Sequence, residues 1–319
     1  MRSSPMRRAL ITAVALVVAA AAALGGLFVA RDLESDELND ATRARVPGRY
    51  LRLSHGVTRY EIGGPAEGQV VVLLHGSNVP YYIWDPTFGD LAQAGFRVIR
   101  YDRIGRGWSD RPGIRYDQSV YVAQFAELLD ALRISVPVDL AGLSLGGSII
   151  TSIAVAHPGR VRSLVYVDPY IRQPRTLSLL ERTPAIAGYL LATFGASSVL
   201  DQASDFLHPE LHPEWDARFA EAMRIKGSRR AIVGDRIANA GLDQRPEIAA
   251  LGKDPRPVMI IWGKQDRVVP FQASEELRGA LPRAEFLAVD QAGHLPHIEQ
   301  PAVVTPALIA FLRRTPAAS

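Results

Sequence analysis

The sequence predicts an α/β protein with one mostly parallel sheet of eight strands, helices on both faces and an inserted helical cap. Beyond Pro47, short β-branched runs alternate with amphipathic stretches, which is typical of βαβ units. This alternation stops after residue 168 and resumes near residue 247. We therefore expect a core made of residues 47–168 and 247–319, and a cap made of residues 169–246.

An apolar segment precedes the core. Residues 9–30 carry no charge, and arginines flank them: Arg2, Arg7 and Arg8 before, Arg31 after. About 20 apolar residues span a bilayer as a helix, whereas the apolar part of a cleavable signal usually has about 7 to 15. We therefore expect residues 1–31 to anchor the chain in a membrane. Because basic flanks stay cytoplasmic, the rest would lie outside the cytoplasm. The alternative is a signal cut within residues 19–23, which releases a secreted protein.

The polar residues 32–46 indicate a short tether between this segment and the core. The strands are then expected at Tyr50–Ser54, Thr58–Ile62, Val70–Leu74, Arg97–Tyr101, Val138–Ala141, Val161–Val167, Val258–Trp262 and Glu285–Val289. The helices are expected at Tyr121–Leu132, Leu145–Ala156, Phe271–Leu281 and Ala302–Arg314, with helical patches such as Trp215–Ile225 in the cap. The cap therefore follows the sixth strand.

Composition excludes several function classes. Among 319 residues, 48% are hydrophobic and 22% charged, as in ordinary globular proteins. The net charge is only +3, and no run of Lys or Arg could follow a phosphate backbone, so nucleic acid is not an expected partner. The chain has no cysteine, which excludes disulfides, Cys-ligated metals and a thiol nucleophile. A nucleophile must be another residue type.

Ser144 is the candidate nucleophile. It lies in Gly142-Leu143-Ser144-Leu145-Gly146, between a predicted strand and a predicted helix. Such a sharp turn lifts the hydroxyl out of the sheet, and its glycines avoid collisions with neighbouring backbone. The pentapeptide alone is a weak signal, and Ser144 as a simple helix cap is the alternative.

A nucleophilic serine needs a base, and the base needs an acid that fixes its tautomer. His294 follows the last predicted strand at the carboxyl edge of the sheet, with His297 as a competitor. Asp266 follows the seventh strand at the same edge, and Asp168, at the end of the sixth, is the alternative acid. The chain order Ser, Asp, His is that of α/β-hydrolases.

An oxyanion hole needs backbone N–H donors that point at the developing charge. One is expected to be the Leu145 N–H, at the start of the helix after Ser144. The other is expected in the loop after the third strand, from Ser77 or, as second choice, Asn78. His75 in the same loop is expected to fix the loop by hydrogen bonds.

The chain resembles the α/β-hydrolase superfamily over roughly residues 50–314. Five blocks in order carry the resemblance: Leu74-His75-Gly76, residues 101–109 (YDRIGRGWS), residues 142–147 (GLSLGG), residues 261–266 (IWGKQD) and Ala292-Gly293-His294. It is most similar to the capped branch of carboxylesterases, monoacylglycerol lipases and C–C bond hydrolases. The resemblance implies a triad of Ser144, Asp266 and His294, with no metal and no cofactor.

Two departures narrow this resemblance. Dehalogenases and epoxide hydrolases of the branch carry an aspartate nucleophile, whereas this chain has Ser144. C–C bond hydrolases usually have a tryptophan after the triad histidine, whereas Leu295 stands here. We therefore expect a serine hydrolase that cleaves carboxylic esters through an acyl-enzyme. The alternatives are a C–C bond hydrolase of a diketone-like substrate and a ligand receptor on a hydrolase scaffold.

The expected substrate is a small apolar ester. Apolar cap residues would suit it, although packing within the cap explains them equally well: Tyr189, Leu190, Leu191, Phe194 and Phe206.

Overall fold

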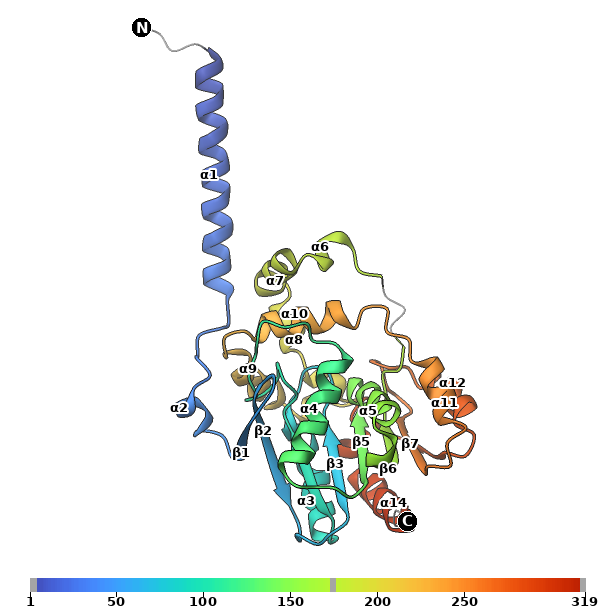
Figure 1. Ribbon diagram of the computed structural model, residues 1–319. Helices are drawn as coiled ribbons and strands as arrows, with labels where there is room; N and C mark the ends of the chain where they lie inside the picture. The colour runs from blue at the N-terminus through green and yellow to red at the C-terminus, as the bar shows by residue number, and fades with distance from the viewer. Residues whose placement is uncertain (1–4, 173–175, 316–319) are drawn as a thin grey trace.

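An eight-stranded sheet lies at the centre of the protein, in the order β1-β2-β4-β3-β5-β6-β7-β8 (Figure 1). The computed structural model describes residues 5–172 and 176–315, so Arg2 lies outside the described residues. β2 is antiparallel to both of its neighbours, and all other pairs are parallel. The predicted mostly parallel sheet is confirmed. Its strands are β1 (Arg49–Leu53), β2 (Gly56–Gly63), β3 (Val70–Leu74), β4 (Arg97–Tyr101), β5 (Val138–Leu143), β6 (Val161–Val167), β7 (Val258–Gly263) and β8 (Glu285–Val289).

Apolar cores cover both faces of the sheet. Side chains alternate along β3, so Val70, Val72 and Leu74 pack into one core, and Val71 and Leu73 into the other. An uninterrupted apolar strand is stable only when both faces are covered. The helices of the first core are α4 (Gln118–Ala131), α5 (Leu145–Ala156), α11 (Arg245–Leu251) and α12 (Ala273–Ala280), and those of the second are α3 (Asp85–Gln93), α13 (Pro296–Glu299) and α14 (Pro301–Arg314).

Sequence patterning did not predict α3 and α11. Each begins with a proline in its first turn, Pro86 and Pro246, and each is short, so neither shows a long apolar period. β5 also runs two residues beyond its predicted end, because Leu143 still pairs with Val167 of β6. This extension brings the strand directly to Ser144.

Helices between β6 and β7 cover the carboxyl ends of the parallel strands (Figure 1). They are α6 (Leu179–Arg182), α7 (Pro184–Thr193), α8 (Ala196–Leu200), α9 (Trp215–Met223) and α10 (Ser228–Ala238). Aromatic rings join them to the core, with Trp215 edge-on to Tyr82 at 5.5 Å between ring centroids. We refer to this part of the chain as the cap.

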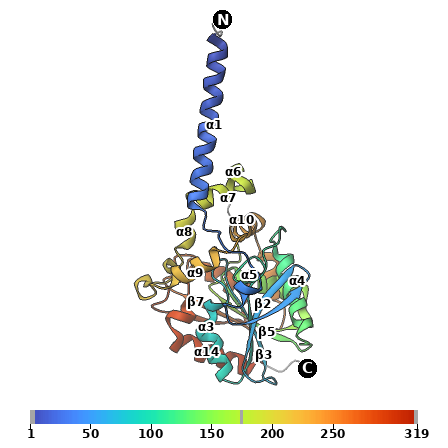
Figure 2. The same cartoon turned by 90° about the vertical axis from the view of Figure 1, so that its left-hand side faces the viewer.

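A long helix, α1 (Pro5–Arg31), projects from the domain (Figures 1 and 2). Within the described residues it is the one helix long and apolar enough to cross a membrane, a test that a signal sequence also passes. The tether after it is packed against the cap. Asp36 forms a parallel bridge with Ile225, and the N–H groups of Ser35 and Asp36 each donate to Arg224 O at 2.8 Å.

Candidate active site

Ser144 occupies a strained turn between β5 and α5. Its φ of +53° and ψ of −120° are rare for a residue with a side chain. A Cβ on Gly142 would lie 2.4 Å from Gly146 O, and one on Gly146 would lie 2.4 Å from Leu74 O. Both glycines are therefore sterically required, and the turn places Ser144 in the wall of a cavity.

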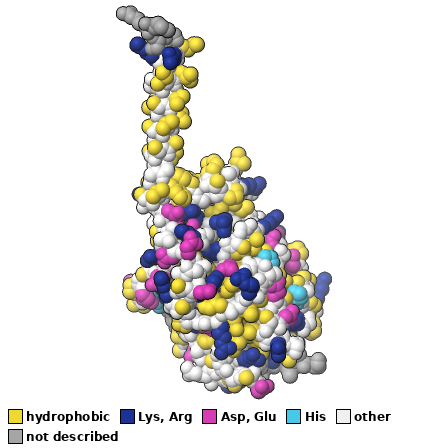
Figure 3. All heavy atoms as spheres, turned by 60° about the vertical axis from the view of Figure 1, so that its left-hand side comes forward, with side chains coloured by type: hydrophobic (Ala, Val, Ile, Leu, Met, Phe, Trp, Pro, Cys, Tyr) yellow, Lys and Arg dark blue, Asp and Glu magenta, His cyan; other side chains and the backbone are white. Residues whose placement is uncertain are grey.

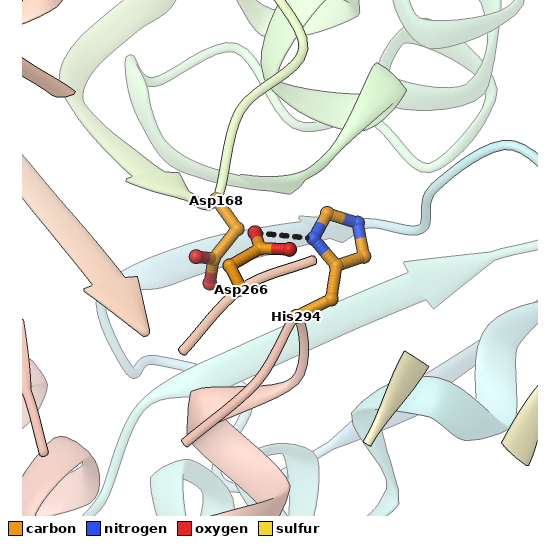
Figure 4. A group of neighbouring side chains, drawn as sticks. All are labelled: Asp168, Asp266 and His294. Carbon is orange, nitrogen blue, oxygen red and sulfur yellow. Dashed lines mark hydrogen bonds and ion pairs between the residues drawn. The ribbon is translucent and has the colours of Figure 1, made fainter. Parts of the chain in front are cut away.

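His294 and Asp266 form a buried pair beside this turn. His294 Nδ1 donates to Asp266 Oδ2 at 2.8 Å (Figure 4). The other carboxylate oxygen, Oδ1, accepts from the N–H groups of Val268 at 2.7 Å and Val269 at 2.9 Å. These bonds fix the carboxylate, and the carboxylate fixes the imidazole tautomer that leaves Nε2 unprotonated.

Ser144 and His294 line the same cavity. Within residues 5–172 and 176–315, no hydrogen bond joins Ser144 Oγ to His294 Nε2. Such catalytic hydrogen bonds are often long without substrate and shorten in the substrate complex. The structure thus brings all three predicted triad residues to one place, with the His–Asp bond already formed.

Asp168, the alternative acid, lies beside Asp266 with a different environment (Figure 4). It is fully buried, and its Oδ1 accepts from the Gly263 N–H at 2.9 Å, while Oδ2 has no partner among the described residues. Burial and the adjacent charge of Asp266 raise the pKa of Asp168 well above its usual range. The protonated form of Asp168 is therefore favoured relative to that of an exposed aspartate.

Asp168, Asp266 and His294 lie close enough together to be considered as a possible metal site. Ligand atoms of Asp168, Asp266 and His294 lie within 4.8 Å of one another. However, the Nδ1 proton and both oxygens of Asp266 already take part in hydrogen bonds. The raised pKa of Asp168 also disfavours the carboxylate form that a cation would need as its ligand. These donors therefore fit a hydrogen-bonded pair better than a metal site.

The pKa of the His294 imidazole is raised. Burial alone would lower it, but the charges of Asp266, Asp205 and Glu299 and the hydrogen bond to Asp266 together outweigh burial. Asp205 is a cap residue in the same cavity, and its backbone oxygen accepts from the His294 N–H at 2.9 Å. Burial raises the pKa of the Asp205 carboxyl to about 6. Two groups with raised pKa values, His294 and Asp205, therefore share the cavity.

The candidate oxyanion donors lie on either side of Ser144. Ser77, Asn78 and Leu145 line the cavity with Ser144. Within the described chain, no acceptor pairs with the N–H of Ser77 or of Leu145. A Cβ on Gly76 would lie 3.2 Å from the Ser144 Cβ, so this loop passes directly beside the serine. Both residues expected to donate these N–H groups therefore line the cavity beside Ser144, the residue that a substrate carbonyl would have to approach.

Two buried arginines hold the loop that carries Ser77, and sequence reasoning missed this role. Arg103 Nη2 donates to Gly76 O at 2.7 Å and to Ser77 O at 3.1 Å, and Arg106 Nε donates to Ser77 O at 2.5 Å. Because C=O and N–H point in opposite directions across a trans peptide, these bonds also fix the N–H groups of Ser77 and Asn78. Asp235 of α10 pairs with Arg106 at 3.0 Å. The cap is thus joined to the oxyanion loop.

The two other histidines near the site, His75 and His297, form hydrogen bonds with backbone groups. His75 Nε2 accepts from the Arg103 N–H at 3.0 Å, so its Nδ1 carries the proton and donates to Gly76 O at 2.9 Å. His297 Nε2 lies 2.9 Å from Ile83 O. Burial lowers the pKa of His297 to about 4. His297 is thereby unsuited to act as the base, and His75 fixes the loop.

The cavity holds about 410 Å³ and is more polar than the sequence suggested. Of the apolar cap residues expected to contact substrate, Tyr189, Leu190, Leu191, Phe194 and Phe206 are all absent from its lining. Apart from Ile232, the residues between β6 and β7 that line the cavity from α8 onward are polar: Ser198, Asp201, Gln202, Ser204, Asp205, Asp235, Arg236 and Asn239. The exposed apolar residues of the cap therefore need another explanation.

Comparison with known proteins identifies relatives of this chain. A family model described as alpha/beta hydrolase fold matches residues 69–301. A 2-hydroxymuconate semialdehyde hydrolase of Pseudomonas putida is 31% identical, over 76% of this chain and 86% of its own. A hydrolase from Pseudomonas aeruginosa superposes with a TM-score of 0.71 at 25% identity, covering 83% and 98% of the two chains. A thermophilic esterase from Thermogutta terrifontis gives 0.72 at 21% identity, covering 85% and 99%, which shows the shared fold.

Proposed function

Because the chain belongs to the α/β-hydrolase family, we propose that this hydrolase cleaves carboxylic esters through an acyl-enzyme formed on Ser144. The observation that carries the proposal is the turn that presents Ser144 to the cavity beside the His294–Asp266 pair. The polar lining favours an ester that carries polar groups near the scissile bond, in place of the wholly apolar substrate expected from the sequence.

The mechanism follows from the positions of these groups. Ser144 Oγ attacks the ester carbonyl while His294 Nε2 takes its proton, and the imidazolium returns that proton to the leaving alcohol. Asp266 stabilises the imidazolium through Nδ1. The N–H groups of Ser77 and Leu145 stabilise the oxyanion. Water, activated by His294, then hydrolyses the acyl-enzyme.

The reaction type is tested by comparing substrates on the purified full chain. We expect kcat/KM for a p-nitrophenyl ester of a short acid to exceed that for a vinylogous 1,5-diketone by more than tenfold, because Leu295 replaces the tryptophan of the C–C bond hydrolases. Ser144→Ala supplies the background rate for both substrates. A higher value for the diketone would assign the protein to C–C bond cleavage.

The pH dependence of kcat/KM tests the base. Only neutral His294 accepts the serine proton, so activity is expected to rise with pH through the pKa of His294, with a midpoint above 6.5. Asp205→Asn removes a negative charge that raises this pKa, so the midpoint should move to lower pH. Asp243→Asn, at an exposed carboxylate outside the cavity, is the control and should leave it in place. A profile flat from pH 5 to 8 with intact fold would contradict a histidine base.

We also propose that α1 is retained as a membrane anchor, with the catalytic domain outside the cytoplasm. Its 27 residues are about 40 Å long at 1.5 Å per residue, enough for a hydrocarbon core of about 30 Å. The cap packs on its last turns, where Tyr189 Oη donates to Leu24 O at 3.1 Å. Protein recovered from membranes is expected to have the intact mass of the full chain. A soluble product that begins near residue 24 would establish a cleaved signal instead.

A further inference from the structure

The cap exposes large apolar side chains beside the base of α1 (Figure 3). Leu179, Leu180 and Phe194 are 81%, 54% and 66% exposed, and Ile186 and Leu190 are each nearly 40% exposed. We call these five residues the cap apolar face. None of them lines the catalytic cavity, so substrate binding there does not explain them.

The spacing of these residues places several of them on one stripe. Ile186, Leu190 and Phe194 follow at intervals of four, which aligns them along one side of α7 and its end. The opposite side of α7, with Leu191 and Ala192, is buried against the domain. A helix that is apolar all round is normally covered on every side, by protein or by lipid.

Contacts with α1 fix the position of this face relative to a membrane. The rings of Phe28 and Tyr189 stack at 6.0 Å, and Tyr189 Oη donates to Leu24 O. Leu24 precedes Arg31 by seven residues, or about 10 Å of helix. If residues 9–30 fill the hydrocarbon core, α7 therefore lies within its outer edge. Figures 1 and 2 both show α7 beside the lower end of α1.

Polar contacts hold the cap and the end of α1 together. Arg229 of α10 forms ion pairs with Asp32 and Glu34, which lie within three residues of the end of α1. Its backbone N–H also donates to Glu34 Oε1 at 2.6 Å. The cap is therefore not free to turn away from a membrane that α1 spans.

We propose that the cap apolar face inserts into the outer interfacial region of the lipid bilayer that α1 spans. The inference rests on the proposed anchor. Interfacial helices bury their apolar face about 5 to 10 Å into the boundary between headgroups and acyl chains, which matches the level of α7 on α1. Tyr189 is of a residue type enriched at this depth. The domain then sits on the membrane in one fixed orientation, with its cap against the lipid.

Site-directed spin labels on the full chain in phospholipid nanodiscs test this inference. Because the chain has no cysteine, single labels can be placed through Leu180→Cys and Phe194→Cys. Leu16→Cys in α1 is the membrane control. Val136→Cys is the water control, since Val136 is 55% exposed and precedes β5, at the sheet edge opposite Ser144. Power saturation measures how readily each reagent reaches the label: oxygen concentrates in lipid, whereas a nickel chelate stays in water.

Labels at 180 and 194 are expected to be relaxed more strongly by oxygen than by the nickel chelate. The label at 16 should behave in the same way, and the label at 136 should show the reverse. Thermal melts of the labelled chains should match that of the parent chain. If the labels at 180 and 194 are exposed to water like the label at 136, while the label at 16 lies in lipid, the proposed insertion of the cap is wrong. The proposed membrane anchor is then still supported. If 16 also lies in water, the anchor fails and this inference fails with it. Labels at 180 and 194 shielded from both reagents would mean that protein, such as a second copy, covers the face, which also overturns the inference.

Discussion

Ser144→Ala and His294→Ala are each expected to lower turnover of an ester substrate by a factor on the order of 10⁴ to 10⁶. Ser144 supplies the attacking oxygen and His294 moves its proton, so the remaining groups retain only binding and oxyanion stabilisation. The double variant should be little worse than either single one, because the two residues act as a unit. The measurement is kcat on a p-nitrophenyl ester at saturating substrate.

Ser197→Ala is the matched control for these variants, since Ser197 is an exposed serine of the cap that does not line the cavity. It should keep activity within a few-fold of the parent chain. All variants should melt near the parent temperature. Activity above about a tenth of the parent value in Ser144→Ala, with a matched melt, would remove Ser144 from the mechanism.

Asp266→Asn is expected to lower turnover by about 10⁴, whereas Asp168→Asn should change it less than tenfold. The amide at 266 cannot stabilise the imidazolium, and it favours the wrong tautomer of His294. At 168 the amide replaces a carboxyl whose Oδ1 accepts from the Gly263 N–H, whereas His294 bonds to Asp266. The raised pKa of Asp168 also favours its uncharged form, which an amide resembles. The two variants have the same chemistry and neighbouring positions, so each serves as the control for the other.

The reverse order of these two effects would assign the acid to Asp168. Equal losses in both would indicate that the two carboxyls share one proton and act as a pair. The kcat values should therefore be compared at a pH above the midpoint of the acid limb, where His294 is neutral in the parent chain.

Elements of the core could be predicted where a short stretch of sequence carries a distinctive pattern of its own. β3 and β4 have the predicted bounds because β3 is an uninterrupted apolar run and β4 pairs β-branched residues with Tyr101 between Gly95 and Asp102. The turn at Ser144 was predictable because only glycine fits at positions 142 and 146. A side chain at either position would collide with backbone atoms. The short α3 and α11 gave no comparable signal.

Other features depend on distances that only the folded chain sets. Arg106 and Asp235 are 129 residues apart, so their pairing, and with it the link between cap and oxyanion loop, has no local sequence signal. Asp168 and Asp266 both follow strands at the same edge, and the hydrogen bond from His294 that selects Asp266 is seen only in the folded chain. The sequence left two roles open for the apolar cap residues, contact with substrate or packing within the cap, and none of them lines the cavity.

Labelling with a fluorophosphonate, followed by peptide mass spectrometry, tests the central claim most directly. Fluorophosphonates react with serines that an adjacent base activates. The adduct is expected on Ser144 in the parent chain, with activity lost in proportion to labelling, and it should be at least a hundredfold slower to form in His294→Ala. Labelling of another serine with loss of activity, or an unlabelled Ser144 in a chain that hydrolyses esters, would contradict the assignment of Ser144 as nucleophile.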